Sequence, residues 1–156
     1  MIQYRISPLK PNSHLFEVSL SFQTTPAQTY TLSLPAWLPG SYMIRDFAKN
    51  IIEINAFDND QNAILLSKND KQTWSLVANT EQVNITYQVF AFDLSVRTAY
   101  LDSQRGFFNG SSTFLQVSEL SDLPCELIIE QPTTTEQQAW RVATGLTRAK
   151  ETEKYQ

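Results

Sequence analysis

The chain has 156 residues, of which 42% are hydrophobic, 12% aromatic and 18% charged, and its formal net charge is −4. This length predicts about one domain with its own core, and the apolar, aromatic composition excludes a disordered chain. The negative charge excludes the basic footprint of a nucleic-acid-binding protein, and no stretch approaches the roughly 18 apolar residues of a membrane helix. We therefore expect neither nucleic acid nor membrane as a partner.

Alternation of apolar and polar residues predicts strands along most of the chain. In the run His14–Phe22 every second side chain is apolar and those between are polar, which is typical of a half-buried strand. Further strands are predicted at Ile2–Ile6, Thr29–Leu34, Ile51–Phe57, Ala63–Leu66, Thr73–Val77, Val83–Ala91, Ser112–Val117 and Cys125–Glu130. Turn residues separate these runs, so we predict an all-β fold, an antiparallel β-sandwich of roughly 8–10 short strands.

The segment Leu34–Phe47, with the sequence LPAWLPGSYMIRDF, calls for its own explanation. Pro39 and Gly40 fit the two central positions of a type II turn, because glycine tolerates the positive φ of the second position. Two interpretations of the flanking aromatic residues stay open. Either Trp37 is the buried plug of a structural corner, or Trp37 and Tyr42 form an aromatic binding platform.

Arg45 and Asp46 follow this turn and are candidate contact residues. If the segment continues as a strand, the two side chains point to opposite faces and do not pair with each other. Each then needs a partner elsewhere, unless Arg45 is simply solvated.

A second unusual segment contains Phe107 and Phe108 between Gly106 and the pair Asn109-Gly110. Adjacent residues of an extended chain face opposite ways, so at least one ring is hard to bury within this domain. Asn-Gly predicts a hairpin turn. One interpretation is a hairpin that presents its tip, Phe107, Phe108, Asn109, Gly110 and Ser111, to a neighbouring domain; the other is a hairpin that packs both rings into its own core.

Residues 136–154 are ambiguous between helix and strand. Ala139, Val142 and Leu146 fit one helical face, but Gly145 and several threonines weaken that pattern. We predict a last short strand at Trp140–Thr144, followed by a polar, charged exit segment.

The residues for metal or nucleophilic chemistry are scarce. His14 and Cys125 are the only histidine and the only cysteine, which is too few for a usual structural or catalytic zinc site. Asp93, Asp102 and Asp122 are the remaining candidates for carboxylate-only catalysis, but nothing in the sequence pairs them as acid and base. We therefore predict no catalytic, metal or cofactor residue in this chain. The N-terminus lacks the layout of a signal peptide, so a cytoplasmic location is expected.

Two long strings carry a family resemblance. Pro35–Tyr42 followed by Ile44–Phe47, and Phe92–Asp102 followed by Arg105–Ser112, resemble the N-terminal domain of the glycyl-aminopeptidase family of zinc metallopeptidases. The resemblance extends over roughly residues 1 to 147. It implies an all-β domain that precedes a thermolysin-like catalytic domain.

The resemblance also implies a reaction. In that family, a zinc-bound water and the glutamate of an H-E-x-x-H helix remove an N-terminal glycine or alanine from a peptide. Leu15 follows the single His14, so this motif is absent and no catalytic or zinc residue carries over to this chain. We expect a β-sandwich domain at 1–147 and, at 148–156, a linker toward a catalytic domain that holds the zinc.

The main functional hypothesis is thus a non-catalytic domain that docks the catalytic domain of its parent protein and shapes the cleft for the peptide substrate. The alternative is a free-standing ligand- or carbohydrate-binding sandwich. Its sugar-stacking candidates are Trp37, Tyr42, Trp74 and Tyr100. No turnover is expected from this chain alone.

Overall fold

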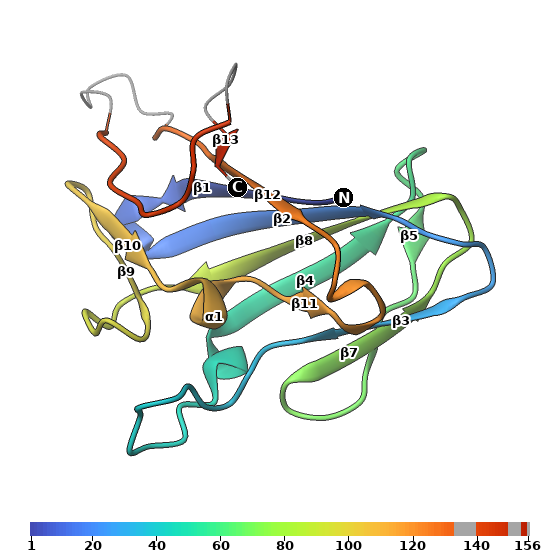
Figure 1. Ribbon diagram of the computed structural model, residues 1–156, viewed down its shortest axis with the longest axis horizontal. Coiled ribbons are helices and arrows are strands. Elements are labelled where there is room, and N and C mark those ends of the chain that lie inside the picture. Colours follow the sequence, from blue (N-terminus) through green and yellow to red (C-terminus); the bar gives the residue numbers. More distant parts are fainter. Residues whose placement is uncertain (133–139, 150–153, 156) are drawn as a thin grey trace.

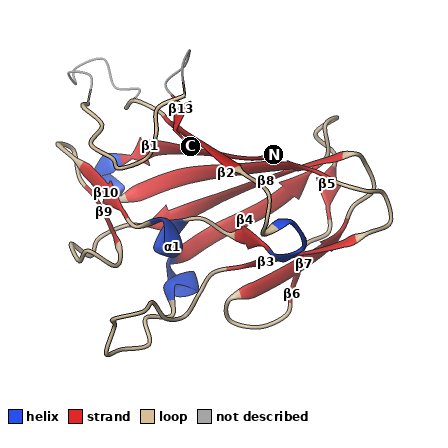
Figure 2. Ribbon diagram, viewed as in Figure 1, coloured by secondary structure: helices blue, strands red, loops and turns tan. Residues whose placement is uncertain are grey.

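The computed structural model describes residues 1–132, 140–149 and 154–155. Strands dominate this part, and Figure 2 shows its helices only as short turns between them. The strands are β1 (Ile2–Lys10), β2 (Leu15–Gln23), β3 (Thr29–Ser33), β4 (Ile51–Phe57), β5 (Ala63–Ile64), β6 (Ser67–Lys68), β7 (Thr73–Val77), β8 (Gln82–Phe90), β9 (Ala99–Leu101), β10 (Gly106–Phe108), β11 (Gln116–Val117), β12 (Cys125–Ile129) and β13 (Lys154–Tyr155). The helical turns are η1 (Pro11–Ser13), η2 (Phe47–Asn50), α1 (Gly110–Thr113) and η3 (Ser118–Leu120). The predicted all-β fold class is confirmed.

Two sheets form the body of the molecule. The larger has the strand order β13-β12-β1-β2-β8-β4-β5, and the smaller has the order β11-β3-β7-β6. All neighbours pair antiparallel except β1 and β12, which run parallel. Figure 1 shows the long strands of the larger sheet side by side, and the separate β9–β10 hairpin at one end of them.

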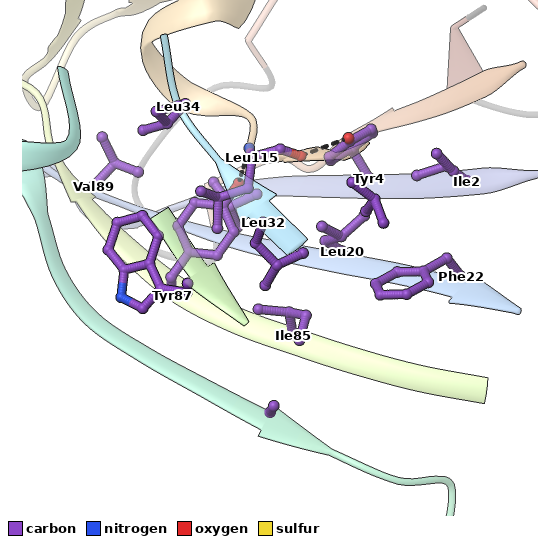
Figure 3. Packing of buried hydrophobic residues seen from close by; sticks show 14 of the residues in the cluster. Ile2, Tyr4, Leu20, Phe22, Leu32, Leu34, Ile85, Tyr87, Val89 and Leu115 are labelled. Atoms are coloured by element: carbon purple, nitrogen blue, oxygen red, sulfur yellow. Dashed lines mark hydrogen bonds between the residues drawn. The ribbon is translucent and has the colours of Figure 1, made fainter. Parts of the chain in front are cut away.

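The core lies between these sheets because alternate side chains turn inward. Burial alternates strictly along most of β2 and β8, and β3 and β7 repeat the pattern from the opposite side. Leu20 and Ile85 of the larger sheet therefore join Leu32 and Leu76 of the smaller sheet in one apolar cluster (Figure 3). Each such buried side chain contributes about 1.5–3 kcal/mol to folding.

Two buried tyrosines anchor the segment that follows α1. Tyr87 Oη donates to the carbonyl of Thr113 at 2.9 Å and accepts the Leu115 N–H at 3.1 Å. Tyr4 Oη donates to the Leu115 carbonyl at 2.7 Å (Figure 3). Burial raises the pKa of both phenols well above the ordinary value. Both rings therefore stay neutral and fix residues 113–115 against the larger sheet.

Two predicted strands form only in part. Of Ala63–Leu66 only β5 is a strand, and within Ser112–Val117 the strand is limited to β11, because Ser112 and Thr113 belong to the single turn α1. The Asn109 side chain accepts the Ser111 N–H, which is a helix N-cap contact that favours this turn over an extended chain.

The strand predicted at Trp140–Thr144 is wrong, since these residues have no regular structure. The reason is local: the Gln131 side chain bonds both the N–H and the carbonyl of Trp140, at 2.6 and 3.1 Å, in place of a neighbouring strand. The helix or strand ambiguity at 136–139 and 150–153 lies outside the described residues. β13 pairs with β12 inside the segment expected as a linker, and the domain boundary at residue 147 stays a prediction.

None of the helices in the described ranges is long and apolar enough to cross a membrane.

Candidate functional site

The predicted turn after β3 is confirmed. The Ser41 N–H donates to the Leu38 carbonyl at 3.0 Å, and Gly40 has a φ of 81°, which places Pro39 and Gly40 at the centre of a type II turn. The interpretation of Trp37 as a buried plug is wrong, because its side chain is 48% exposed. Its indole Nε1 donates to the Ser41 carbonyl at 2.7 Å, so the ring closes the turn from outside the core.

Three large apolar residues leave this turn toward solvent. Tyr42, Met43 and Ile44 are all exposed, and Tyr42 is fully so. The buried Ser41 fixes their backbone, since its hydroxyl donates to the Met43 carbonyl at 2.9 Å. The exposure is therefore a property of a hydrogen-bonded loop.

Arg45 and Asp46 do not continue as a strand. Both of their N–H groups donate to the Ala36 carbonyl, at 2.7 and 3.2 Å, and Asp46 adopts a left-handed φ of 49°. The Asp46 carboxylate lies 2.7 Å from Lys71 Nζ, an ion pair to a residue distant in sequence. The Arg45 Nε is buried and has no hydrogen-bond partner in the part of the chain that the structure describes.

A second loop, residues 92–98, lies against the first. Thr98 Oγ1 closes it by donating to the Asp93 carbonyl at 2.6 Å. The Arg97 guanidinium donates to the Gly40 carbonyl at 3.1 Å and so ties the two loops together. Both loops project from the same end of the molecule, at the left of Figure 1.

These two loops gather exposed apolar side chains. The members, which we call the apolar end, are Tyr42, Met43, Ile44, Phe92, Leu94 and Val96, with exposed fractions between 56% and 105%. Contiguous exposed apolar patches on a folded domain mark interaction surfaces. Residues 92, 94 and 96 were missed as site residues. Their signal was the period-two apolar pattern, which runs on past the end of β8.

The hairpin predicted at Asn109-Gly110 is wrong. The turn joining β9 to β10 lies at residues 102–105, where Asp102 Oδ1 accepts the N–H groups of Gln104 and Arg105 at 2.8 and 2.9 Å. These bonds lower the pKa of the Asp102 carboxyl. An aspartate that satisfies two turn N–H groups thus fixes the hairpin four residues ahead of the Asn-Gly pair.

Phe107 and Phe108 lie on opposite faces of β10, as expected for adjacent residues of a strand. Phe108 packs edge-on against Phe16 and Phe114, with ring centroids 5.9 and 5.5 Å apart. Phe107, on the opposite face of β10, stays 40% exposed. The expectation that one ring is left uncovered by this domain is confirmed.

Asn109, Gly110 and Ser111 occupy a different place from the one predicted. Asn109 Nδ2 donates to the Val96 carbonyl at 3.1 Å, which braces the second loop from behind. Gly110 and Ser111 line a cavity of about 600 Å³ that Tyr4 also borders. The structure therefore does not gather the predicted contact residues into one surface.

A smaller cavity of about 270 Å³ lies between the two loops. Arg45, Lys49 and Asp93 are its charged lining residues, and Phe92 and Ile44 are among its apolar ones. The Tyr42–Asp46 segment and the second loop therefore share both an apolar surface and a polar recess.

Neither metal nor acid–base chemistry finds support in this arrangement. Within residues 1–132, 140–149 and 154–155, no group of three His, Cys, Asp or Glu side chains could hold a metal ion. His14 contacts the Leu101 carbonyl through Nδ1, and its ring lies 4.0 Å from that of Phe92. The Asp102 carboxylate is occupied by its turn. The described residues therefore do not fit a zinc site.

The four candidate sugar-stacking residues do not share one surface. Trp74 is buried in the core, and Tyr100 stacks against Phe92 with ring centroids 5.8 Å apart. Trp37 and Tyr42 are the two members that project from the first loop.

Comparison with known proteins gives two findings. Residues 3–156 match the family model described as the peptidase M61 N-terminal domain. Among solved structures, the chain is similar to an aminopeptidase N family protein from Idiomarina loihiensis, with a TM-score of 0.90 and 42% sequence identity. The match covers 99% of this chain but 26% of that one, so this chain spans about a quarter of its length. No curated protein matches.

Proposed function

The chain belongs to the peptidase M61 N-terminal domain family, and from this premise we propose that it serves as the non-catalytic N-terminal domain of a zinc metallo-aminopeptidase. In this proposal it docks the catalytic domain of its parent and helps to shape the cleft for the peptide substrate. Preference for an N-terminal glycine or alanine, and the zinc ion, belong to that catalytic domain. A cytoplasmic location stays a prediction from the sequence.

The apolar end carries the proposal. Six large apolar side chains stand in solvent on two loops that are themselves held by hydrogen bonds. Covering each of them would stabilise an assembly by up to about 1.5–3 kcal/mol, so a partner surface is the physical use of this arrangement. The similar protein from Idiomarina loihiensis is nearly four times as long as the matched part, and a chain of that kind has a remainder available to cover it.

The first test is the coding DNA beyond Gln156. An in-frame continuation with an H-E-x-x-H motif is expected, and a stop codon there would remove the parent on which the proposal depends. The 156-residue chain, purified alone, is expected to show no turnover of glycyl or alanyl anilides with or without zinc.

The second test uses the full-length parent. Ile44→Ser and Phe107→Ala are expected to lower kcat/KM on a glycyl anilide and to loosen the domains, seen as faster release of the N-terminal domain in limited proteolysis. Leu65→Ser is the matched control, because Leu65 is 83% exposed beside β5, at the opposite end of the molecule (Figure 1). If all three variants behave like the wild type, the docking role is wrong.

Carbohydrate binding remains a second candidate because Trp37 is half-exposed and adjoins the fully exposed Tyr42. Sugar rings stack on such aromatic faces. Titration of the chain with oligosaccharides, followed by tryptophan fluorescence, distinguishes the two functions. A saturable change that Trp37→Ala abolishes supports the binding module, and no response to any glycan favours the docking domain.

A further inference from the structure

Arg45 has an unusual environment for an arginine. Arg45 lines the 270 Å³ cavity between the two loops, and its side-chain Nε is buried with no hydrogen-bond partner in the described part of the chain. Other arginines have partners: Arg5 pairs with Glu130, and Arg97 bonds the Gly40 carbonyl.

A buried N–H donor without an acceptor is costly. The Arg45 Nε–H has been withdrawn from water without an acceptor, which destabilises the folded domain unless a partner restores the hydrogen bond. The guanidinium fork matches a carboxylate through two parallel N–H···O bonds. A carboxylate group is therefore the acceptor that best satisfies the Arg45 side chain.

The charges around the cavity favour the same ligand. Lys49 lines it together with Arg45, and the nearby Asp46 carboxylate is already paired with Lys71. Asp93 is the one carboxylate residue among the described residues that line the cavity, which leaves the recess with an excess of cations on a chain whose net charge is −4. This local inversion of sign attracts an anionic partner.

The apolar surroundings indicate what carries that carboxylate. Met43, Ile44 and Phe92 line the cavity and also belong to the apolar end. A docked polypeptide surface would cover these side chains and exclude water around the ion pair, which strengthens it. Arginine is one of the residue types enriched at interface hot spots, which lie in pockets that become desolvated in the complex.

We propose that the cavity receives an aspartate or glutamate side chain from the polypeptide that covers the apolar end, with Arg45 as its bidentate partner. The inference rests on the proposed docking function and adds the chemistry of the contact. The contact is a carboxylate that bonds Arg45 and is surrounded by the apolar side chains of the cavity.

The carboxylate site is testable on the 156-residue chain without its parent. The probe is sodium propionate at constant ionic strength, followed in ¹⁵N NMR spectra by the Arg45 Nε–Hε resonance. Because Arg45→Gln lacks that group, the backbone amide resonances of the lining residues Phe92 and Thr98 report binding in the variants. A saturable shift is expected, with affinity lost about tenfold to a hundredfold in Arg45→Gln, because that variant lacks the charge-assisted bonds. Arg105→Gln is the matched control, since Arg105 is exposed and 3.9 Å from Asp102.

Three outcomes of this titration overturn the proposal. If chloride or inorganic phosphate shifts the resonance as strongly as propionate does, the recess is an unspecific anion site. An Arg45 resonance that ignores propionate but moves in Asp93→Asn shows that the partner is internal. Propionate binding that survives Arg45→Gln assigns the site to Lys49.

The parent protein supplies the second readout. Arg45→Glu is expected to release the N-terminal domain from the parent in limited proteolysis, and reversal of one carboxylate residue on the covering surface to arginine is expected to restore association. Failure of every such reversal overturns the ion pair. If the parent has no covering domain, the docking function fails while the propionate titration still reports on the recess itself, so the two failures are distinguishable.

Discussion

In β2, β8, β3 and β7 most of the large apolar side chains turn inward, whereas on the loops at residues 42–44 and 92–96 they are exposed. The backbone is well bonded in both regions. The strands pair along their lengths, and the loops are closed by Ser41, Arg97 and Thr98. Both regions therefore have a hydrogen-bonded backbone, and they differ in whether their large apolar side chains are buried or exposed.

This difference separates stability from function. The body buries its own apolar surface and should account for the free energy of unfolding of the domain. The apolar end buries little of its own surface, so changes there should leave that free energy almost unchanged and act only when a partner is present. Each prediction below compares a residue of one region with a chemically matched residue of the other.

The largest contrast is expected between two leucines. Leu32 is fully buried between the sheets, so Leu32→Ala should lower the free energy of unfolding by about 2–5 kcal/mol. Leu94 is exposed on the second loop, and Leu94→Ala should change it by no more than about 0.5 kcal/mol. Urea unfolding of both variants provides the measurement. Equal losses would mean that the second loop packs inward in solution.

A hydroxyl deletion gives the next contrast. Tyr87→Phe removes the partner of the Leu115 N–H and the Thr113 carbonyl in a buried site, and should lower the free energy of unfolding by about 1–3 kcal/mol. Tyr42→Phe alters a ring that is fully exposed and should be neutral in the same urea titration. A neutral Tyr87→Phe would show that residues 113–115 are not anchored to the larger sheet.

Alkaline pH tests the same buried tyrosines without mutation. Burial raises the pKa of Tyr87 and Tyr4, so both stay protonated when folded but ionise near pH 10 when unfolded. Their stabilisation is complete below about pH 10, and above it each should cost about 1.4 kcal/mol of unfolding free energy per pH unit. Urea titrations between pH 9 and 11.5 measure the slope, which Tyr87→Phe should reduce. An unchanged slope in that variant would contradict the assignment.

The sequence predicted the body well because burial there follows a local period. Each half-buried strand needs an apolar residue at every second position, and the runs that became β2, β3, β7 and β8 show this pattern directly. The Pro39-Gly40 turn was predictable for a similar reason, since glycine is the residue that its positive φ favours.

The errors arose where side chains rather than neighbouring strands satisfy the backbone. Asp102 fixes the β9–β10 turn and Asn109 caps α1 through N–H groups two or three residues ahead, and Gln131 bonds both polar groups of the Trp140 backbone nine residues ahead. Such side-chain contacts compete with extended structure, and the alternation of apolar residues does not reveal which of them forms. The sequence also does not reveal that the Arg45 Nε lacks a hydrogen-bond partner among the described residues, because this depends on which acceptors the neighbouring loops place near it.

The smallest expected effect concerns the turn that orients the apolar end. An alanine at position 40 would meet no atom within 4 Å, so the expected loss of about 1 kcal/mol in Gly40→Ala comes from its left-handed φ alone. Gly145 is the control, because it also has open space but no positive φ, and Gly145→Ala should be neutral or slightly stabilising. Urea unfolding distinguishes the two variants. If Gly40→Ala is as harmless as Gly145→Ala, the turn is not held in solution, and Tyr42, Met43 and Ile44 form no fixed surface for a partner to meet.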